Sequence, residues 1–288
     1  MPAITVLMSA YNAEKYISES IESILNQTFN DFEFIIINDG STDNTAKIIK
    51  SYKDDRIKYI SHENSGLAKS LNKGIRVANG TYIARLDADD VSYPERLEEQ
   101  FKFMEDNPTY VVCGSYADVI DESGNFIYIF NDIPSVDKEI KNAMNYKNCF
   151  IHSSTFYRRD SALSIGGYYE PIRQYFEDYI FFYQILKKGK GYNFKKPLIK
   201  YRITPNSITN RHKNKKYKQL INSVVSRGYI TEEEKNFLFS YTSKKRNKKA
   251  QLFNYYLKLS RLIIIHQNNY KKAFKYFIKA IKSIYKEI

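Results

Sequence analysis

The chain has little of the residue chemistry that structural metal sites and disulfide scaffolds require. Cys113 and Cys149 are its two cysteines among 288 residues, and they form no Cys-x-x-Cys pair. This excludes zinc-finger spacing and a disulfide-stabilised fold, and it predicts two reduced, buried thiols in a cytosolic protein. The histidines are scattered and form no His-Glu-x-x-His motif: His62, His152, His212 and His266.

Long apolar runs are also missing. No segment approaches the roughly 18 consecutive apolar residues that a membrane span needs, and Leu262–Ile265 is bounded by Arg261 and His266. The first nine residues have neither a cationic start nor a long apolar core, so we expect no signal peptide. These absences predict a cytoplasmic protein.

Acidic and basic residues are unevenly divided along the chain. Residues 1–178 carry a net charge of −10 and residues 179–288 carry +23, which together give the overall +13. The acidic first part argues against nucleic-acid binding there. The basic second part suits an anionic surface, either a membrane or a nucleic acid.

Short β-branched runs alternate with helical patterns in the first 114 residues. Strands are predicted at 4–8, 34–37, 57–60, 82–86 and 110–114, and helices at 15–25, 44–52, 67–78 and 94–105. Such repeats are typical of an α/β fold with a mostly parallel sheet and helices on both faces. Ligands of such sheets bind beyond the carboxyl ends of the strands. This rule selects four segments: Ser9–Asn12, Asn38–Asp43, Glu63–Gly66 and Asp87–Asp90.

The pattern changes after this region. A hairpin is predicted over 118–130, a strand over 153–159, a helix over 176–187 and a final strand over 197–203. From about residue 211 the sequence is helical and rich in lysine. We therefore predict two parts, an α/β domain of residues 1–210 and a basic helical region of residues 211–288.

Three carboxylates are crowded at the predicted end of the fourth strand, where Asp87, Asp89 and Asp90 lie within four residues. Two bare charges about 4 Å apart repel by about 4 kcal/mol at an effective dielectric of about 20. A divalent cation would turn this repulsion into attraction and could bridge to a diphosphate. The alternative is a helix cap formed by Asp90 or Ser92. An EF-hand calcium loop does not fit, because Val91 and Ser92 replace an oxygen ligand and a glycine.

Two further acidic positions attract attention. Asp39 directly follows the second predicted strand, where a base or ribose would be held, although Asn-Asp-Gly also suits a turn and Asp43 a helix cap. Glu177 and Asp178 begin a predicted helix, a position that the helix dipole favours in any case. Just before them, the Gly/Tyr loop Gly166–Glu170 could present aromatic faces to a sugar.

Together these segments resemble the family 2 glycosyltransferases, and in particular the bacterial members that build capsule, exopolysaccharide or lipopolysaccharide repeat units. The resemblance covers residues 3 to about 207. It implies an inverting enzyme with the Rossmann-like GT-A fold and, in this chain, a C-terminal helical extension. It is carried by segments that occur in the family's order: Ser9–Asn12, Asn38–Asp43, Asn64–Ala68, Ala84–Asp90, Pro94–Gln100, Gly166–Tyr168 and Glu177–Asp178.

The resemblance implies a role for each matching residue. A UDP-sugar would be held by Ser9, Tyr11, Asp39, Asn64, Asp87, Ala88 and Arg202. Asp89, the second acid of the DxD motif, would bind Mn²⁺ or Mg²⁺. Asp178 would be the general base, Glu177 its supporting neighbour, and His152 would lie at the acceptor side of the cleft.

Two positions depart from the family's pattern. Leu71 precedes Asn72 where many relatives carry an arginine, so Lys69 or Arg76 would have to supply that positive charge. Thr204 stands where many relatives have the histidine of Tyr-Arg-x-His.

The basic tail predicts a helical hairpin. A helix over 270–288 would carry lysines beside an apolar face, turn at Asn268–Asn269 and pack on a helix over 250–266. Such a basic amphipathic helix also suits an anionic membrane surface, and the two readings are compatible. The predicted apolar face consists of Tyr270, Phe274, Phe277, Ile278, Ile281, Ile284, Tyr285 and Ile288.

The function expected from this resemblance is metal-dependent transfer of a hexose or N-acetylhexosamine from a UDP-sugar. The acceptor would be a glycan or lipid-linked oligosaccharide, and the enzyme would lie at the cytoplasmic face of the inner membrane. A catalytically silent sugar-nucleotide-binding or scaffold protein of the same fold is the main alternative. A nucleotidyltransferase is disfavoured because no Gly-rich phosphate loop follows the first strand, and a nucleic-acid binder could use only the tail.

Overall fold

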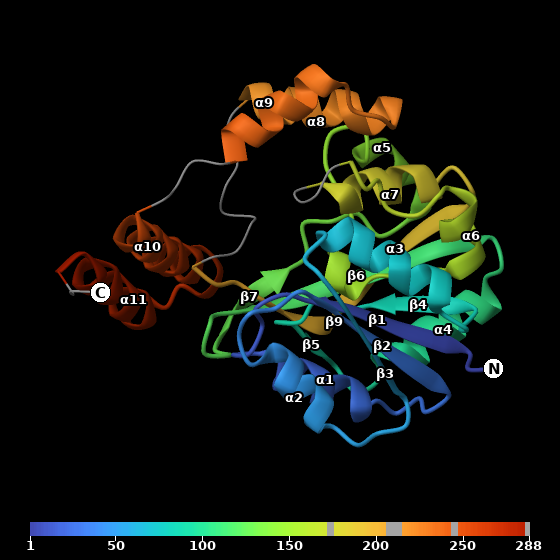
Figure 1. The fold of residues 1–288 in the computed structure, drawn as a ribbon. Coiled ribbons are helices and arrows are strands. Elements are labelled where there is room, and N and C mark those ends of the chain that lie inside the picture. The colour runs from blue at the N-terminus through green and yellow to red at the C-terminus, as the bar shows by residue number, and fades with distance from the viewer. Residues whose placement is uncertain (172–175, 206–214, 243–246, 286–288) are drawn as a thin grey trace.

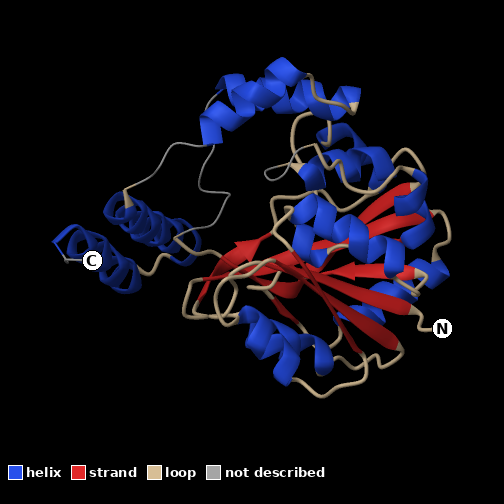
Figure 2. Ribbon diagram, in the orientation of Figure 1, coloured by secondary structure: helices blue, strands red, loops and turns tan. Residues whose placement is uncertain are grey.

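A single mixed sheet forms the centre of the protein (Figures 1 and 2). The computed structural model describes residues 1–171, 176–205, 215–242 and 247–285. Within these residues, nine strands pair in the order β3-β2-β1-β4-β8-β6-β9-β5, with β7 paired to β6. The strands are β1 (Ile4–Ala10), β2 (Phe32–Asp39), β3 (Ile57–His62), β4 (Tyr82–Arg85), β5 (Val91–Ser92), β6 (Tyr110–Ile120), β7 (Phe126–Phe130), β8 (Phe156–Arg158) and β9 (Lys190–Arg202).

The first four strands confirm the predicted parallel repeats. β1 lies between β2 and β4, and Ile4 pairs in register with Phe32 on one side and Tyr82 on the other. Beyond β4 the sheet becomes mixed, because β8 runs antiparallel between β4 and β6. β6 therefore does not continue the β/α series as the predicted strand at 110–114 would have done. It instead pairs in parallel with β9 and forms the predicted hairpin with β7.

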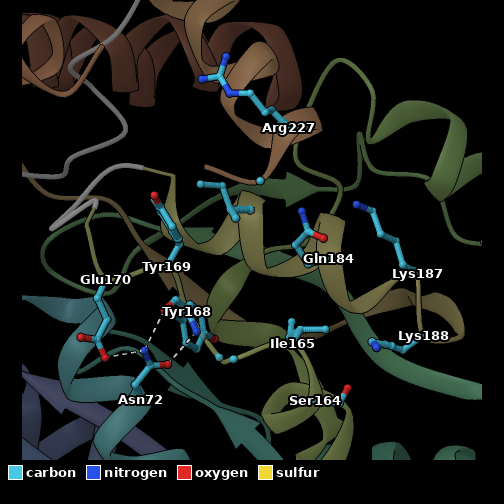
Figure 3. A pocket seen from close by; sticks show the side chains of 14 residues that line it. Asn72, Ser164, Ile165, Tyr168, Tyr169, Glu170, Gln184, Lys187, Lys188 and Arg227 are labelled. Carbon is cyan, nitrogen blue, oxygen red and sulfur yellow. Dashed lines mark hydrogen bonds between the residues drawn. The ribbon is translucent and has the colours of Figure 1, made fainter. Parts of the chain in front are cut away.

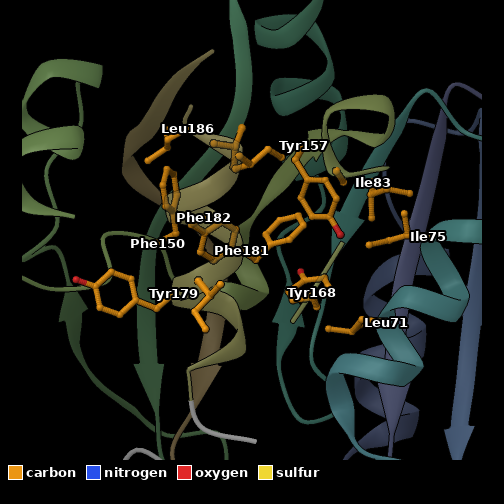
Figure 4. Packing of buried hydrophobic residues seen from close by; sticks show 14 of the residues in the cluster. Leu71, Ile75, Ile83, Phe150, Tyr157, Tyr168, Tyr179, Phe181, Phe182 and Leu186 are labelled. Carbon is orange, nitrogen blue, oxygen red and sulfur yellow. The ribbon is translucent and has the colours of Figure 1, made fainter. Parts of the chain in front are cut away.

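Helices cover both faces of the sheet, as Figure 1 shows. On β2, Ile35 and Ile37 join one apolar cluster while Phe34 and Ile36 join the other, which explains the continuous apolar run of this strand. Figure 4 shows the first cluster, in which α3 and α7 pack on the sheet. The helices up to this point are α1 (Ile17–Leu25), α2 (Thr45–Ser51), α3 (Leu67–Val77), α4 (Arg96–Asp106), α5 (Asp137–Ala143), α6 (Arg159–Ser164) and α7 (Glu177–Ile185), with a 3₁₀ turn at His152–Ser154.

The remaining chain forms two separate helical pairs. α8 (Lys215–Arg227) and α9 (Glu232–Thr242) lie on the α7 side, whereas α10 (Lys248–Gln267) and α11 (Tyr270–Tyr285) lie beside β7 (Figure 1). The domain boundary predicted near residue 210 falls in 206–214, outside the described residues. The helices of the described residues do not combine the length and hydrophobicity needed to cross a membrane.

The α10–α11 hairpin confirms the predicted turn and the predicted packing of the two helices on each other. Asn268 adopts the left-handed conformation with φ of 48° and ends α10. The side of α11 that faces α10 and β7 carries Ala273, Tyr276 and Ala280, whereas Phe274 and Phe277 are exposed. The predicted apolar face is thus divided: Phe274 and Phe277 are exposed, Ile278 and Ile281 are half-buried, and Ile288 lies outside the described residues. The small Ala273 and Ala280 allow the close approach of the two helices, and the ring of Tyr276 is buried beside them.

Candidate active site

The loops that follow β1 and β2 are joined to each other. The backbone N–H of Asn12 donates to Ser41 Oγ at 3.1 Å, and the N–H of Thr42 donates to Asn12 Oδ1 at 2.8 Å. Tyr11, directly before Asn12, exposes half of its side chain, and Ser9 lies half-buried at the end of β1. This edge of the sheet therefore offers an aromatic ring on a rigid double loop, where the nucleotide was predicted.

Asp39 organises the loop that leads into α3. Its carboxylate accepts hydrogen bonds from the backbone N–H groups of Ser65 at 2.8 Å and Gly66 at 3.0 Å, and its carbonyl accepts one from Asn64. Gly40 is required here, because its φ is +71° and a Cβ would lie 2.5 Å from the Asn64 nitrogen. Asp39 and Asn64 are thus brought together as predicted, and Asp39 also holds the loop. The turn alternative is compatible with this arrangement.

Positive charge gathers next to this loop. A hollow of about 700 Å³ is bordered by Asn64 and by Lys69, Lys73 and Arg76 of α3. Leu71 is fully buried in the core, so the position where relatives carry an arginine faces away from this hollow. Arg76 lies 3.9 Å from Glu170, which also borders the hollow, so the substitution of that arginine by Lys69 or Arg76 stays a prediction.

A fully buried arginine contacts the DxD turn. Arg85, at the end of β4, forms an ion pair with Asp87, and the N–H of Asp87 donates to Ser153 Oγ at 2.7 Å. Burial opposes ionisation, but the charge of Arg85 keeps the pKa of Asp87 below its usual value. Ala88 is buried between the aspartates and packs in the core. Asp87 is therefore ionised and already paired within the protein.

The other two aspartates lie where a negative charge is unfavourable. Burial and then the charge of Asp87 raise the pKa of Asp89 to about 7, and burial raises the pKa of Asp90 further. In the described residues no side chain donates a hydrogen bond to the Asp89 carboxylate, and Asp90 Oδ2 has no partner. The predicted cap is not seen, because Asp90 Oδ1 instead accepts from the backbone N–H of Arg202 at 2.7 Å. A cation beside Asp89 would relieve this repulsion.

Arg202 lies against the turn but is engaged by the protein. Its Nε donates to the Asp89 carbonyl at 2.8 Å, its Nη1 to the Asp121 carbonyl at 3.3 Å, and its Nη2 to Glu19 at 2.5 Å. The side chain is 2% exposed. Arg202 therefore fixes the shape of the DxD turn, and contact with a diphosphate stays a prediction.

Glu177 and Asp178 begin α7; Glu177 is buried and Asp178 is half-buried. Asp178 accepts hydrogen bonds from Asn148 Nδ2 at 2.8 Å and from the Tyr179 N–H at 2.7 Å. Burial raises the pKa of Asp178 to about 6. Burial and the charge of Asp178 raise the pKa of Glu177 to about 8, and its Oε2 has no partner among the described residues.

The two acidic groups, 87 residues apart at their nearer ends, belong to one site. The N–H of Asp87 donates to Ser153, and the ring of the adjacent His152 lies 5.9 Å from the ring of Phe182 in α7, so contacts connect the strand end to the helix start. His152 lies between these elements, with Nε2 2.8 Å from Tyr168 Oη. Burial and then the charge of Arg85 lower the pKa of His152 to about 3, so its ring is neutral.

Asn72 is a positioning residue that sequence reasoning did not identify. Its Oδ1 accepts from the Tyr168 N–H at 2.7 Å, and its Nδ2 donates to the Tyr168 carbonyl at 2.8 Å and to Glu170 at 2.9 Å (Figure 3). A Cβ on Gly167 would lie 2.3 Å from the Asn72 oxygen. The Gly/Tyr loop is thus clamped to α3 beside a hollow of about 730 Å³. The Asn72 position was noted only as part of a departure from the family's pattern.

Comparison with known proteins agrees with this geometry. The family model described as "Glycosyl transferase family 2" matches residues 5–166. An uncharacterized glycosyltransferase of Haemophilus influenzae is 37% identical over 238 residues, covering 76% of this chain and 72% of the relative. The putative glycosyltransferase EpsE of Bacillus subtilis is 37% identical over 73% of this chain and 76% of its own. The O-antigen biosynthesis glycosyltransferase WbnJ of Escherichia coli is 37% identical over 69% and 79%.

A solved structure confirms the fold class. S. aureus TarS 1-349 in complex with UDP-GlcNAc superimposes with a TM-score of 0.64 at 17% identity, covering 98% of this chain and 89% of that one. The α/β core with its helical extension is therefore the GT-A fold that the sequence resemblance implied. The chain belongs to the family 2 glycosyltransferases.

Proposed function

We propose that this transferase moves a hexose or N-acetylhexosamine from a UDP-sugar to a hydroxyl of a growing cell-surface glycan, with inversion at the anomeric carbon. One observation carries the proposal. Two acidic groups, one at the end of β4 and one at the start of α7, are connected through Ser153 and His152. The relative WbnJ, named for O-antigen biosynthesis, and the UDP-GlcNAc complex of TarS support the substrate class.

Asp178 acts as the general base. Its carboxylate is oriented by Asn148 and by the Tyr179 N–H, and a pKa of about 6 leaves it ionised near neutral pH. It takes the proton of the acceptor hydroxyl as that oxygen forms a bond to the anomeric carbon. The bond from this carbon to the UDP oxygen breaks on the opposite face, and UDP leaves. A positioned base is worth roughly 10²–10⁴-fold in rate.

Asp89 is the residue that would hold Mn²⁺ or Mg²⁺. When bound, the ion would neutralise charge on the departing diphosphate. Within the described residues no three His, Cys, Asp or Glu side chains are grouped as a complete ligand set. This fits Mg²⁺ chemistry, which commonly uses one or two carboxylates together with substrate phosphates and water. Asp87, which is paired with Arg85, would face the ribose.

The acceptor in this proposal is carried on a lipid, so the enzyme works at the cytoplasmic face of the membrane. In this proposal the acceptor hydroxyl approaches the Asp178 carboxylate, which Asn148 orients. The neutral ring of His152 lies beside the Gly/Tyr loop.

The test is UDP release from a panel of UDP-glucose, UDP-galactose and their N-acetyl forms, with and without Mn²⁺. We expect metal-dependent release with one of these donors. Asp178→Asn should lower transfer by about 10²–10⁴-fold while UDP-sugar binding, measured by calorimetry, stays near the wild-type value. Asp160→Asn, the same change in the exposed first turn of α6, is the matched control. Near-normal turnover of Asp178→Asn would remove Asp178 from the base role, and binding without turnover in the wild type would favour the catalytically silent alternative.

A further inference from the structure

The outer side of the α10–α11 hairpin exposes large apolar side chains. Phe274 is 61% exposed and Phe277 39%, and their rings lie 6.5 Å apart. Spacings of three, four and seven residues place these side chains along one face of α11. We call this face the exposed stripe: Tyr270, Phe274, Phe277 and Ile284. A contiguous apolar face of this kind marks an interaction surface, whereas single exposed apolar residues do not.

Positive charge lies next to the exposed stripe. Residues 248–285 contain nine lysines and arginines and no aspartate or glutamate. On α11 four lysines border a hollow of about 490 Å³, which we call the lysine hollow. Lys271 and Lys275 form no ion pair within the described part of the chain, whereas Lys272 donates to the Phe126 carbonyl at 2.7 Å. The residues of the lysine hollow are Asn125, Asn269, Lys271, Lys272, Lys275, Tyr276 and Lys279.

We propose that the hairpin docks on an anionic phospholipid bilayer. The exposed stripe enters the boundary between headgroups and acyl chains, and the lysine hollow receives headgroup phosphates. Charge complementarity selects the occupant, because the four lysines of the lysine hollow lie on a hairpin whose own described residues include no acidic side chain. The stripe selects a bilayer over a nucleic acid, since phosphates of a nucleic acid would leave the phenylalanines in water. This inference rests on the proposed function and identifies the surface that brings the enzyme to a lipid-carried acceptor.

The hairpin is firmly attached to the active site. Tyr276, on the side of α11 opposite to solvent, donates its hydroxyl to Asp121. The Asp121 carbonyl accepts from Arg202, and the Arg202 N–H donates to Asp90 at 2.7 Å. A bilayer bound to α11 would therefore be held at a fixed orientation to the DxD turn.

The experiment is sedimentation of the full chain with vesicles. We expect binding to equimolar phosphatidylcholine and phosphatidylglycerol, weakening as salt is raised, and little binding to phosphatidylcholine alone. Lys271→Gln with Lys275→Gln should weaken binding by about thirtyfold, since each near-surface lysine contributes about fivefold. Phe274→Ser with Phe277→Ser should weaken it by about a hundredfold.

Two control variants distinguish binding by the hairpin from nonspecific electrostatic or hydrophobic binding elsewhere on the protein. Lys47→Gln with Lys102→Gln removes two exposed lysines from α2 and α4, and Tyr146→Ser removes an exposed aromatic ring elsewhere. Both should bind vesicles like the wild type. Equal binding of all variants, or equal binding to neutral and anionic vesicles, would overturn the proposal. Salt-sensitive binding of duplex DNA without vesicle binding would also overturn it and assign the lysines to nucleic acid.

The outcome is separable from that of the proposed function. UDP release from the free donor does not require vesicles, so it is measured on the same samples. If the wild type releases UDP but does not bind anionic vesicles, only the proposed docking surface is contradicted. If the wild type binds vesicles but releases no UDP from any donor, only the transferase proposal is contradicted.

Discussion

The catalytic core and the C-terminal hairpin depart from ordinary burial in opposite ways. In the core, charged side chains are buried with unpartnered atoms within the described residues, among them Arg85 Nε, Asp90 Oδ2 and Glu177 Oε2. In the hairpin, Ala273 and Ala280 are buried while Phe274 is exposed.

Each arrangement costs stability, because a buried unsatisfied polar group and an exposed apolar face are both unfavourable in water. The comparison teaches that each region is shaped for a partner. The core is suited to a charged ligand. The hairpin is suited to a surface that has both anionic groups and an apolar interior.

The largest effect is expected where the core would meet its charged ligand. Asp89→Asn should lower turnover at least about 10²-fold and remove its dependence on Mn²⁺, since a metal ion supplies several kcal/mol of charge stabilisation. The same change should raise the free energy of unfolding of the ligand-free protein, because it removes a buried charge beside Asp87. Activity at the wild-type level with unchanged metal dependence would contradict the assignment, and Asp160→Asn again serves as the control.

Only part of the difference between the two regions could be predicted from the sequence. The β/α repeats, and the acids at Asp87–Asp90 and Glu177–Asp178, could be predicted because they depend on local periodicity and on residues at strand and helix ends. The short strand β5 could not be predicted, because two residues are too few to show an alternating hydrophobic pattern. Its partner β9 is also distant in sequence.

Long-range contacts explain the remaining differences. Asn72 clamps Tyr168 across 96 residues, and Arg202 reaches Asp90 across 112, so no local pattern reports either bond. The buried side of α11 could not be predicted from the apolar face alone, because the sequence left open whether Phe274 packs or is exposed. The structure uses Ala273 and Ala280 for close packing and lets Tyr276 reach Asp121.

The clamp on the Gly/Tyr loop provides the next test. Asn72→Ala would leave the buried N–H and carbonyl of Tyr168 unpaired, at about 1–3 kcal/mol. We expect kcat/KM for the acceptor to fall about tenfold or more, while the affinity for UDP-sugar changes little. Asn142→Ala, an exposed asparagine on α5, should change neither quantity. If the acceptor kinetics of Asn72→Ala match the wild type, the loop does not depend on the clamp.

Glu177 tests whether the core sacrifices stability for its site. Its pKa is about 8 in the folded protein, above the value of about 4.3 expected in the unfolded chain. The folded state therefore binds more protons between these values, and stability falls as pH rises through this window.

Glu177→Gln should remove that fall and stabilise the protein by on the order of 1–3 kcal/mol at pH 8, with little difference below pH 4. Chemical denaturation of both proteins across this range measures it. A wild type whose stability rises from pH 5 to 8 more steeply than that of the variant would reverse the sign and contradict the burial of a neutral Glu177.

The smallest effect is expected on the exposed side of the hairpin. Phe274→Ser should change the free energy of unfolding in the absence of lipid by less than about 0.5 kcal/mol, because the ring is exposed and the two residues have similar helix propensities. Ala280→Leu, one of the small residues against α10, should cost about 1–3 kcal/mol through overpacking. Denaturant titrations of the two variants compare the sides of α11 directly. If Phe274→Ser were the more damaging change, the aromatic side would be the packed one, and the contrast between core and hairpin would disappear.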